Sequence, residues 1–304
     1  MTLMENSIAR ASRTQKQILT DLAKETLVGM GLFETVTYSF TSPNVYKSLG
    51  FKKDEYPAVV RIANPLGEDQ SIMRTTLIPS MLEVLSRNYN RRIADCRIFE
   101  IANIYLPKSN SIDELPNEIP TLAIGEYGDE IDFYTLKGQV EVLFDVFGIL
   151  DNIKFVPGVH PSFHPGRTAK VMFDQEEIGV IGEIHPRIAE NYELEIRILI
   201  GELNFEKLMK FANIKRKYKP LPKYPAVTRD LAIVVDKNIL ASQIEEIIVK
   251  TGGELLEEAE LFDVYEGNQI AEGYKSMAYS LRFRAADRTL KDEEVNDLLN
   301  NIIA

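Results

Sequence analysis

The sequence predicts an α+β protein of two units, a larger one of mixed helices and strands followed by a smaller one. Three observations predict it. The chain of 304 residues exceeds the usual size of one domain. Helical and strand patterns alternate without strict βαβ repetition, which favours a largely antiparallel sheet. The stretch 215–225 contains three prolines, which remove backbone donors and disfavour helix, so we place a linker there.

The composition is that of an ordinary globular protein, with 45% hydrophobic and 27% charged residues. Cys96 is the single cysteine and cannot form an intramolecular disulfide. The N-terminal residues lack the order of a signal peptide, and no apolar run approaches the ~20 residues of a membrane span. We therefore expect a cytoplasmic protein with no membrane association.

The elements of the larger unit follow from hydrophobic periodicity. Apolar residues of 13–30 recur at helical spacing, and Gly29 and Gly31 end the helix. Residues 34–40 alternate apolar and polar side chains, which predicts a half-buried strand. Further on, the patterns predict helices at 78–89 and 132–147, a strand at 96–106, a loop through Pro120, a strand at 121–125, and three strands between 168 and 204 with a short helix after Pro186.

The smaller unit follows the linker and has a simpler order. Its patterns predict a strand at 231–235, a helix at 241–250, strands at 255–264 and 276–284, and a helix at 292–303. This βαββα order is one strand short of the ferredoxin-like βαββαβ fold. We expect the fourth strand just past Ala304, and a sheet without it has an unpaired edge.

Net charge bears on any interaction with nucleic acid. The formal charge of −11 repels phosphate, so binding requires a local basic patch. One such patch occurs before Asp230 and is formed by Lys215, Arg216, Lys217, Lys219, Lys223 and Arg229. Taken alone, this basic run is explained as a solvated linker.

Recognition of an RNA stem-loop uses cations for phosphates and aromatic rings for unstacked bases. Strand alternation places Arg282 and Arg284 together on the face opposite Phe283. Arg229 and Arg288 lie beside aspartates and are equally suited to internal ion pairs. We expect the acidic cluster of residues 254–263 to face solvent. The candidates for RNA binding are Lys223, Arg229, Arg282, Arg284 and Arg288, with Tyr265 and Tyr274 nearby.

The histidines do not predict a metal site. His160 and His164 have the spacing of a zinc pair on a helix, but Pro161 and Pro165 argue against a helix, and no second ligand pair follows. The segment His164-Pro-Gly-Arg167 instead predicts a tight turn, with an unusual backbone angle at Gly166 and local pairing of Arg167.

No catalytic residue is predicted either. No Ser/His/Asp order and no phosphate-binding loop occur in the sequence. Cys96 lies in an apolar strand, where a buried, inert thiol is expected.

The motifs in both units resemble one family. Tyr224-Pro-Ala-Val-Thr-Arg-Asp-Leu-Ala232 and Phe283-Arg-Ala-Ala-Asp-Arg-Thr-Leu290 resemble the ferredoxin-fold anticodon-binding domain that ends the β subunit of bacterial phenylalanyl-tRNA synthetase. The larger unit resembles the catalytic-like module of that subunit at Glu34-Thr-Val-Thr-Tyr-Ser-Phe40, Asn64-Pro-Leu-Gly-Glu68, Met73-Arg-Thr-Thr-Leu77, Arg97-Ile-Phe-Glu-Ile101, Asp132-Phe-Tyr-Thr-Leu-Lys-Gly138, His164-Pro-Gly-Arg167 and Gly182-Glu-Ile-His-Pro186.

The resemblance implies a class II synthetase-like module at 1–214 and an anticodon-binding domain at 226–304 that lacks its last strand. It implies tRNA(Phe) and a catalytic α subunit as partners, in an α2β2 heterotetramer. ATP and Mg²⁺ are implied at the α-subunit site, and no cofactor is implied for this chain. The editing and magnesium-holding modules of the family are not represented, so the chain resembles the C-terminal portion of a longer β subunit.

Adenylation requires one arginine on the ATP α-phosphate, a second on the γ-phosphate at a helix start, and carboxylates for Mg²⁺. Arg97 with Glu100 resembles the strand motif that supplies the first arginine. The second is missing, because Gly179-Val-Ile-Gly182 is followed by Glu183 and His185 rather than by arginine. We therefore expect a catalytically silent module with Arg97 and Glu100 as a structural strand pair. The alternative is a free-standing enzyme that adenylates an amino acid by itself.

Overall fold

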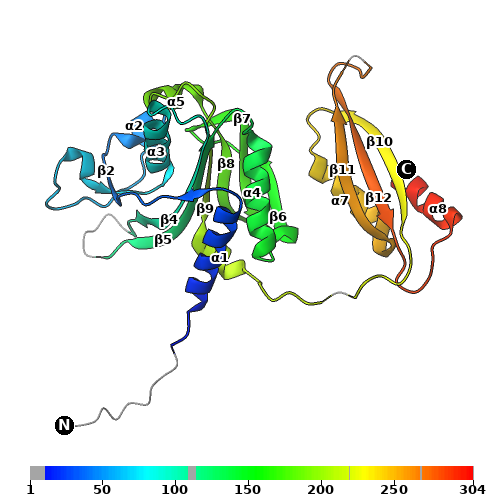
Figure 1. Ribbon diagram of the computed structural model, residues 1–304. Helices are drawn as coiled ribbons and strands as arrows, with labels where there is room; N and C mark the ends of the chain where they lie inside the picture. The colour runs from blue at the N-terminus through cyan, green and yellow to red at the C-terminus, as the bar shows by residue number, and fades with distance from the viewer. Residues whose placement is uncertain (1–10, 109–113, 219, 268, 304) are drawn as a thin grey trace, which may run out of the picture. The chain divides into compact units, whose positions relative to one another are not determined.

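The computed structural model describes residues 11–108, 114–218, 220–267 and 269–303. The chain divides into two compact units, residues 1–216 and 217–304, which we call the larger and the smaller unit. The linker predicted at 215–225 spans this division (Figure 1).

The larger unit is built on a seven-stranded sheet with the order β1-β4-β5-β9-β8-β7-β6. All its neighbouring strands are antiparallel except β1 and β4, which confirms the predicted largely antiparallel α+β fold. The strands are β1 (Phe33–Glu34), β4 (Cys96–Leu106), β5 (Asn117–Tyr127), β6 (Ile153–Pro157), β7 (Phe163–Phe173), β8 (Glu176–Ile184) and β9 (Leu199–Asn204), with a separate pair β2 (Phe40–Thr41) and β3 (Ile72–Met73).

Helices cover both faces of this sheet (Figure 1). One face packs against α1, α4 and α6, and the other packs against α3 and α5. The helices α1 and α4 begin at side-chain caps, in which Thr14 and Asp132 accept backbone N–H groups of the first turns, and His185 and Asn204 cap α5 and α6 in the same way. The helices are α1 (Gln15–Gly29), α2 (Val45–Ser48), α3 (Ile78–Asn90), α4 (Phe133–Val146), α5 (Pro186–Asn191) and α6 (Phe205–Phe211).

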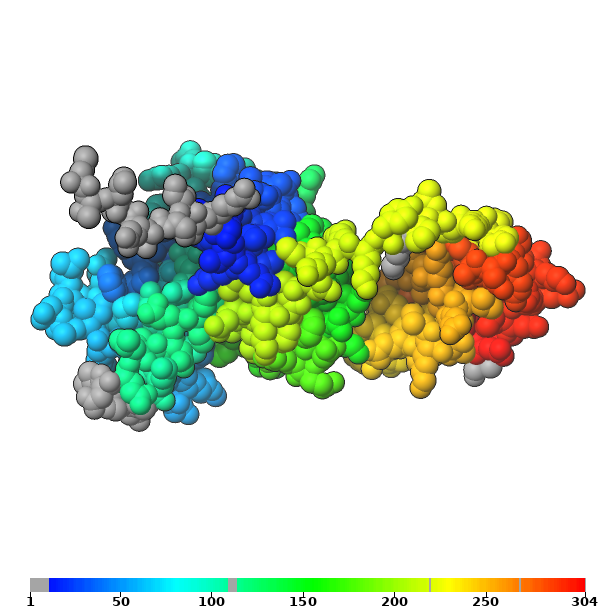
Figure 2. Space-filling model, turned by 90° about the horizontal axis from the view of Figure 1, so that it is seen from below, coloured from blue at the N-terminus to red at the C-terminus, as the bar shows by residue number. Residues whose placement is uncertain are grey.

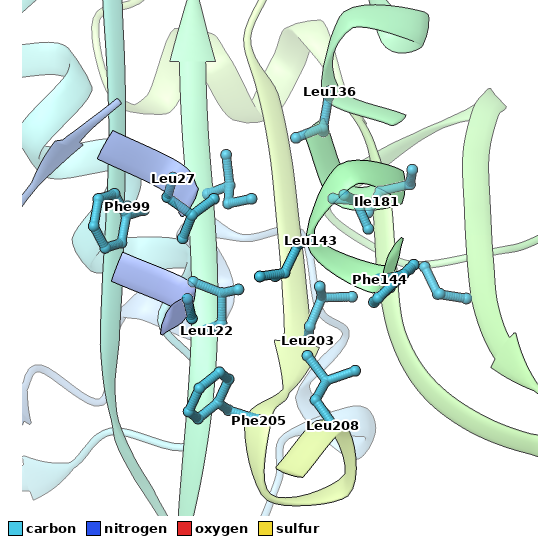
Figure 3. Close-up of a cluster of buried hydrophobic side chains, with 14 of the residues drawn as sticks. Leu27, Phe99, Leu122, Leu136, Leu143, Phe144, Ile181, Leu203, Phe205 and Leu208 are labelled. Atoms are coloured by element: carbon cyan, nitrogen blue, oxygen red, sulfur yellow. The ribbon is translucent and has the colours of Figure 1, made fainter. Parts of the chain in front are cut away.

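The strand β5 shows why the sheet is covered on both faces. Leu122 and Ile124 pack into the core below α1 and α4, whereas Ala123 between them packs below α3. Figure 3 shows the first of these cores, where Leu143 and Phe144 of α4 lie near Leu203 of β9. Burial of each such side chain stabilises the fold by about 1.5–3 kcal/mol.

The sequence patterns failed at several boundaries. Residues 34–40 do not form one half-buried strand, because the chain pairs only briefly, as β1 and β2, and leaves Val36 and Tyr38 86% and 76% exposed. The strand β6 was not predicted, since five residues with a largely exposed outer face give little periodicity. The strand β5 begins at Asn117 rather than at residue 121, which shortens the predicted loop.

The smaller unit has the predicted βαββα order. Its strands form an antiparallel sheet with the order β10-β12-β11, and α7 and α8 pack on one face of it. The fourth strand expected past Ala304 lies outside the described residues. The elements are β10 (Val227–Asp236), α7 (Ala241–Gly252), β11 (Leu256–Tyr265), β12 (Tyr274–Phe283) and α8 (Asp292–Ile303).

Candidate nucleic-acid interface

The arginines of β12 and its end are held by glutamates of the neighbouring strand. Arg282 Nε lies 3.1 Å from Glu257 Oε2, and its Nη2 pairs with Glu258. Arg284 Nε shares the same Glu257 oxygen at 3.0 Å. The acidic cluster therefore does not simply face solvent, as the sequence led us to expect: Glu257 and Glu258 neutralise the two arginines proposed to meet RNA.

Arg284 also fixes the start of the smaller unit. Its Nη1 donates to the carbonyl oxygen of Tyr224 at 2.5 Å, which ties the segment before β10 to the sheet. Its side chain is only 21% exposed, against 46% for Arg282. Arg282 is thus the freer of the two, and exposed ion pairs such as its own contribute only about 0–1 kcal/mol, so a phosphate can compete for it.

The other candidate cations differ in their surroundings. Arg229 pairs with Asp292 of α8 at 2.6 Å and not with the adjacent Asp230. Arg288 pairs with Glu294 at 2.8 Å. Among the described residues, the Lys223 ammonium has no ion-pair or hydrogen-bond partner, so of the five candidates it is the one whose charge is not already compensated. RNA binding by all five remains a prediction.

The face of the sheet away from the helices carries more acid than base. Arg282 lies opposite Thr228 and Glu258, and two positions along, Ser280 lies opposite Asp230 and Glu260. Tyr265 and Tyr274 are 42% and 45% exposed, so both rings are accessible. Cations at the end of this face and rings along it are therefore the groups available to RNA.

The structure does not pair Arg97 with Glu100. Residues three apart on a strand point to opposite faces, so Arg97 binds the neighbouring Asp95 at 3.2 Å. Glu100 is buried and pairs instead with Arg74, whose Nη1 lies 3.3 Å from Glu100 Oε1. The prediction of a structural pair within this motif was wrong, and the partner that sequence reasoning missed lies in another quoted motif, Met73-Arg-Thr-Thr-Leu77.

This buried ion pair positions the exposed segment between β1 and β2. Glu100 accepts from the backbone N–H and the hydroxyl of Thr37, at 3.0 and 2.7 Å. Arg74 donates to Thr37 Oγ1 and to the carbonyl oxygens of Tyr38 and Asn103. The segment that presents Val36 and Tyr38 is therefore anchored from beneath.

The segment His164-Pro-Gly-Arg167 is not a tight turn. It lies inside β7, where the register with β8 shifts between Phe163 and Thr168, and Gly166 is not among the residues with positive φ. The segment is instead held locally, because His164 Nδ1 accepts from Gly166 N and Thr168 Oγ1 donates to the His164 carbonyl. Arg167 pairs across the strands with Glu183, at 2.7 and 2.9 Å.

The environments of His160 and Cys96 are apolar. His160 packs edge-on against Phe51 and Phe163, and burial lowers its pKa to about 4. His164 stacks on His185, with 6.2 Å between the ring centroids. Burial also raises the pKa of the Cys96 thiol, as an inert cysteine requires.

The described residues contain no group of three or more His, Cys, Asp or Glu side chains placed to hold a metal ion. No helix among them has both the length and the apolar character that crossing a bilayer demands.

Buried carboxyl groups were missed by the sequence reasoning. Glu126 of β5 is fully buried beside Gln139 of α4, and desolvation raises its pKa to about 7. Glu202 of β9 accepts from Leu77 N and Thr76 Oγ1 and holds the start of α3, and burial raises its pKa as well. Strand alternation gave the only signal, since each carboxylate occupies a core-facing position.

The two residues that resemble the ATP-binding strand motif both have ion-pair partners within the protein. Arg97 is already paired with Asp95, and Glu100 is buried with Arg74. Helices and apolar cores pack against both faces of the sheet.

The chain has a synthetase-like fold. Two solved structures of pyrrolysyl-tRNA synthetase from Desulfitobacterium hafniense match this chain with a TM-score of 0.52 at 18% and 19% identity. The matches cover 63% of this chain and 67% and 66% of the solved chains. At this identity the likeness establishes the fold alone.

The sequence identifies the family more specifically than the fold does. Residues 1–205 match the phenylalanyl tRNA synthetase beta chain CLM domain, and residues 222–304 match the ferredoxin-fold anticodon binding domain. The chain belongs to the phenylalanyl-tRNA synthetase β-chain family, as its motifs predicted.

Curated relatives that match this chain over nearly its whole length have the same family name. Phenylalanine–tRNA ligase beta subunits from Clostridium tetani and Clostridium acetobutylicum are 46% and 40% identical over 99% of this chain. That of Bacillus cereus is 35% identical over 100% of it. The chain spans 38% of the length of each of these relatives.

Proposed function

We propose that this chain is the tRNA-binding and scaffold part of a phenylalanine–tRNA ligase β subunit, which supports ATP-dependent charging of tRNA(Phe) with phenylalanine by an α subunit. The observation that carries the proposal is that a synthetase-like unit, which lacks the second ATP arginine and has Glu100 buried with Arg74, is followed in the same chain by an anticodon-binding domain. We therefore place the chemistry in the partner.

An apolar surface on the larger unit supports the existence of that partner. Phe33, Val36 and Tyr38 are 75%, 86% and 76% exposed on the segment that follows α1. Figure 2 shows α1, in blue, at the surface of the larger unit. Exposed apolar groups in such a cluster mark protein contacts. We assign this surface, Phe33 to Phe40 with the outer side of α1, to the α subunit in an α2β2 heterotetramer.

In the smaller unit, we assign Lys223 and Arg282 to the phosphates of the anticodon stem-loop. Lys223 is uncompensated among the described residues, and Arg282 is half exposed with ion pairs that cost little to exchange. Arg284 has the role of positioning Tyr224. Arg229 and Arg288 are the weaker candidates, because each is paired with a residue of α8.

ATP and Mg²⁺ belong in this proposal to the α-subunit site, and the assembled enzyme to the cytoplasm. The chain itself is expected to bind neither ligand, because the second ATP arginine is missing from its sequence and Glu100 is buried with Arg74.

The test is co-expression of this chain with the α subunit, followed by co-purification and a mass measurement, with ATP–pyrophosphate exchange measured on each preparation. We expect a stable complex, exchange that depends on the α subunit, and none from this chain alone. Phenylalanine-dependent exchange by the isolated chain would instead establish the free-standing enzyme, and failure of the two chains to associate would remove the scaffold role.

A further inference from the structure

Three quoted motifs that the proposed function does not use meet at one cleft of the larger unit. Asp132 and its neighbours begin α4, Arg167 lies in β7, and Glu183 lies near the end of β8. Together with Arg197, just before β9, they line a cleft of about 400 Å³. Segments distant in the sequence thus contribute polar side chains to one concave site.

Two guanidinium groups are held in place at this cleft by a single carboxylate. Glu183 has a side chain only 10% exposed, and its two oxygens accept from Arg167 Nη1 at 2.9 and 2.7 Å. Arg197 Nε lies 3.4 Å from one of the same oxygens. Both arginine side chains remain about half exposed, at 49% and 50%. Among the described residues, Arg167 Nη2 and both Nη atoms of Arg197 donate to no protein group.

The acidic groups of the cleft are committed within the fold. Glu183 is shared by the arginines, and Asp132 accepts from Thr135 N and Oγ1 as the cap of α4, which lowers its pKa and keeps it ionised. The free polar groups that remain are therefore hydrogen-bond donors arranged as planar forks, which suit phosphate and carboxylate oxygens.

An exposed aromatic ring completes the site. Tyr134 lines the cleft and is 73% exposed, and Phe133 supports it edge-on at 5.7 Å between ring centroids. A large exposed ring beside arginine forks is the arrangement that stacks a nucleic-acid base while its phosphate is bound.

We propose that this cleft binds one unstacked nucleotide, with its phosphate on Arg167 and Arg197 and its base on Tyr134. The adjoining cleft across α5 shares Glu183 and Arg197 but carries Glu190 and Glu195, which repel further phosphates. The site therefore takes a single nucleotide rather than a backbone tract. The bound nucleotide is either an exposed nucleotide of tRNA or a free nucleotide. The site belongs to the larger unit, whereas the RNA contacts of the proposed function belong to the smaller unit.

The test uses the full chain with two probes, a tRNA(Phe) transcript followed by fluorescence anisotropy and AMP followed by calorimetry. The variants are Arg197→Ala, whose only ion pair among the described residues is the 3.4 Å one to Glu183, and Tyr134→Ala. Arg61→Ala is the matched control, because Arg61 is exposed, outside the cleft and without a side-chain partner among the described residues. Tyr134→Phe keeps the ring.

For a tRNA source, we expect Tyr134→Ala to weaken tRNA binding by roughly 5-fold or more, Tyr134→Phe and Arg61→Ala to leave it within about 2-fold, and Arg197→Ala to lower the salt slope by about 1. For a free-nucleotide source, AMP binds the wild type and both cleft variants lose it while tRNA binding is unchanged. If the folded cleft variants bind both probes as Arg61→Ala does, the proposal is overturned. The same result is expected if the arginines bind a carboxylate of a partner protein instead of a nucleotide. This outcome is independent of whether the α subunit co-purifies.

Discussion

Gln139 Nε2 donates to Glu126 Oε2 over 3.0 Å in the interior of the larger unit, and the Oε1 atom of each residue has no hydrogen-bond partner in the described part of the chain. Burial raises the pKa of Glu126 to about 7, so near neutral pH its carboxyl group is partly protonated. A proton on Glu126 converts one of two unpaired acceptors into a donor, which lowers the cost of burying the pair.

The pH dependence of stability follows from this raised pKa. Because the folded pKa lies above the ordinary value of 4.5, the folded state holds more protons between about pH 4.5 and 7, and the contribution of Glu126 is fully present below that range and lost as pH rises through it. The loss amounts to about 3 kcal/mol. Glu126→Gln supplies a permanent donor, so we expect the variant to gain stability over wild type as pH rises.

Urea unfolding at about pH 5 and pH 8 measures this gain as the difference between variant and wild type. The comparison with wild type is needed because His160 also titrates. Its pKa is lowered to about 4, so its contribution makes the protein more stable as pH rises over much of the same range. Glu118→Gln, on the exposed start of β5, is the control. A difference that stays constant with pH would show that Glu126 is ionised throughout.

The buried ion pair of Arg74 and Glu100 leads to a second prediction. Both side chains are at most 3% exposed, so Arg74→Ala leaves an uncompensated buried carboxylate. We expect a loss of about 3–5 kcal/mol in the free energy of unfolding. The double variant Arg74→Met with Glu100→Leu should recover part of it, measured by urea unfolding, and a double variant no more stable than Arg74→Ala would contradict this account.

The assigned partner surface gives a third prediction. Tyr38→Asp places a charge on the exposed apolar segment between β1 and β2, and we expect it to reduce co-purification with the α subunit at least 10-fold, because a charge in the core of an interface is desolvated without a partner. Val159→Asp changes a residue that is 85% exposed outside this segment and should have no effect. Equal recovery of the two variants would move the partner elsewhere.

The fourth prediction concerns the cations beside the sheet of the smaller unit. Removing Lys223 and Arg282 together should weaken tRNA binding and lower the dependence of log Kd on log salt by up to about 2, since two phosphate contacts are lost. Lys250→Ala, on α7, removes a charge from the other side of the sheet and serves as the control. An unchanged salt slope in the double variant would take both residues out of the RNA contact.

Arg284 is expected to behave differently from Arg282. Because its guanidinium binds the Tyr224 carbonyl, Arg284→Ala should speed hydrogen exchange and proteolysis of residues 220–226, whereas Arg282→Ala should leave them unchanged. Limited proteolysis of the two variants side by side distinguishes the roles, and equal cleavage rates would mean that this contact does not hold the segment.

The sequence by itself determined the family, the fold class and nearly every long element. Strong periodicity predicted α1, α3, α4 and the βαββα order of the smaller unit, because their apolar positions coincide with the buried faces. The motifs were recognisable without knowledge of their contacts.

Only the tertiary structure decided what the polar residues do. Arg74 and Glu100 are 26 residues apart and share one buried site, and Arg282 and Arg284 meet glutamates of a neighbouring strand. Residues 34–40 alternate as a strand does, yet Val36 and Tyr38 remain exposed because that segment is anchored through Thr37 and has no sheet to cover it. Local spacing fixes which face of an element a side chain occupies, but its partner depends on which elements pack together, and that is decided by contacts distant in the chain.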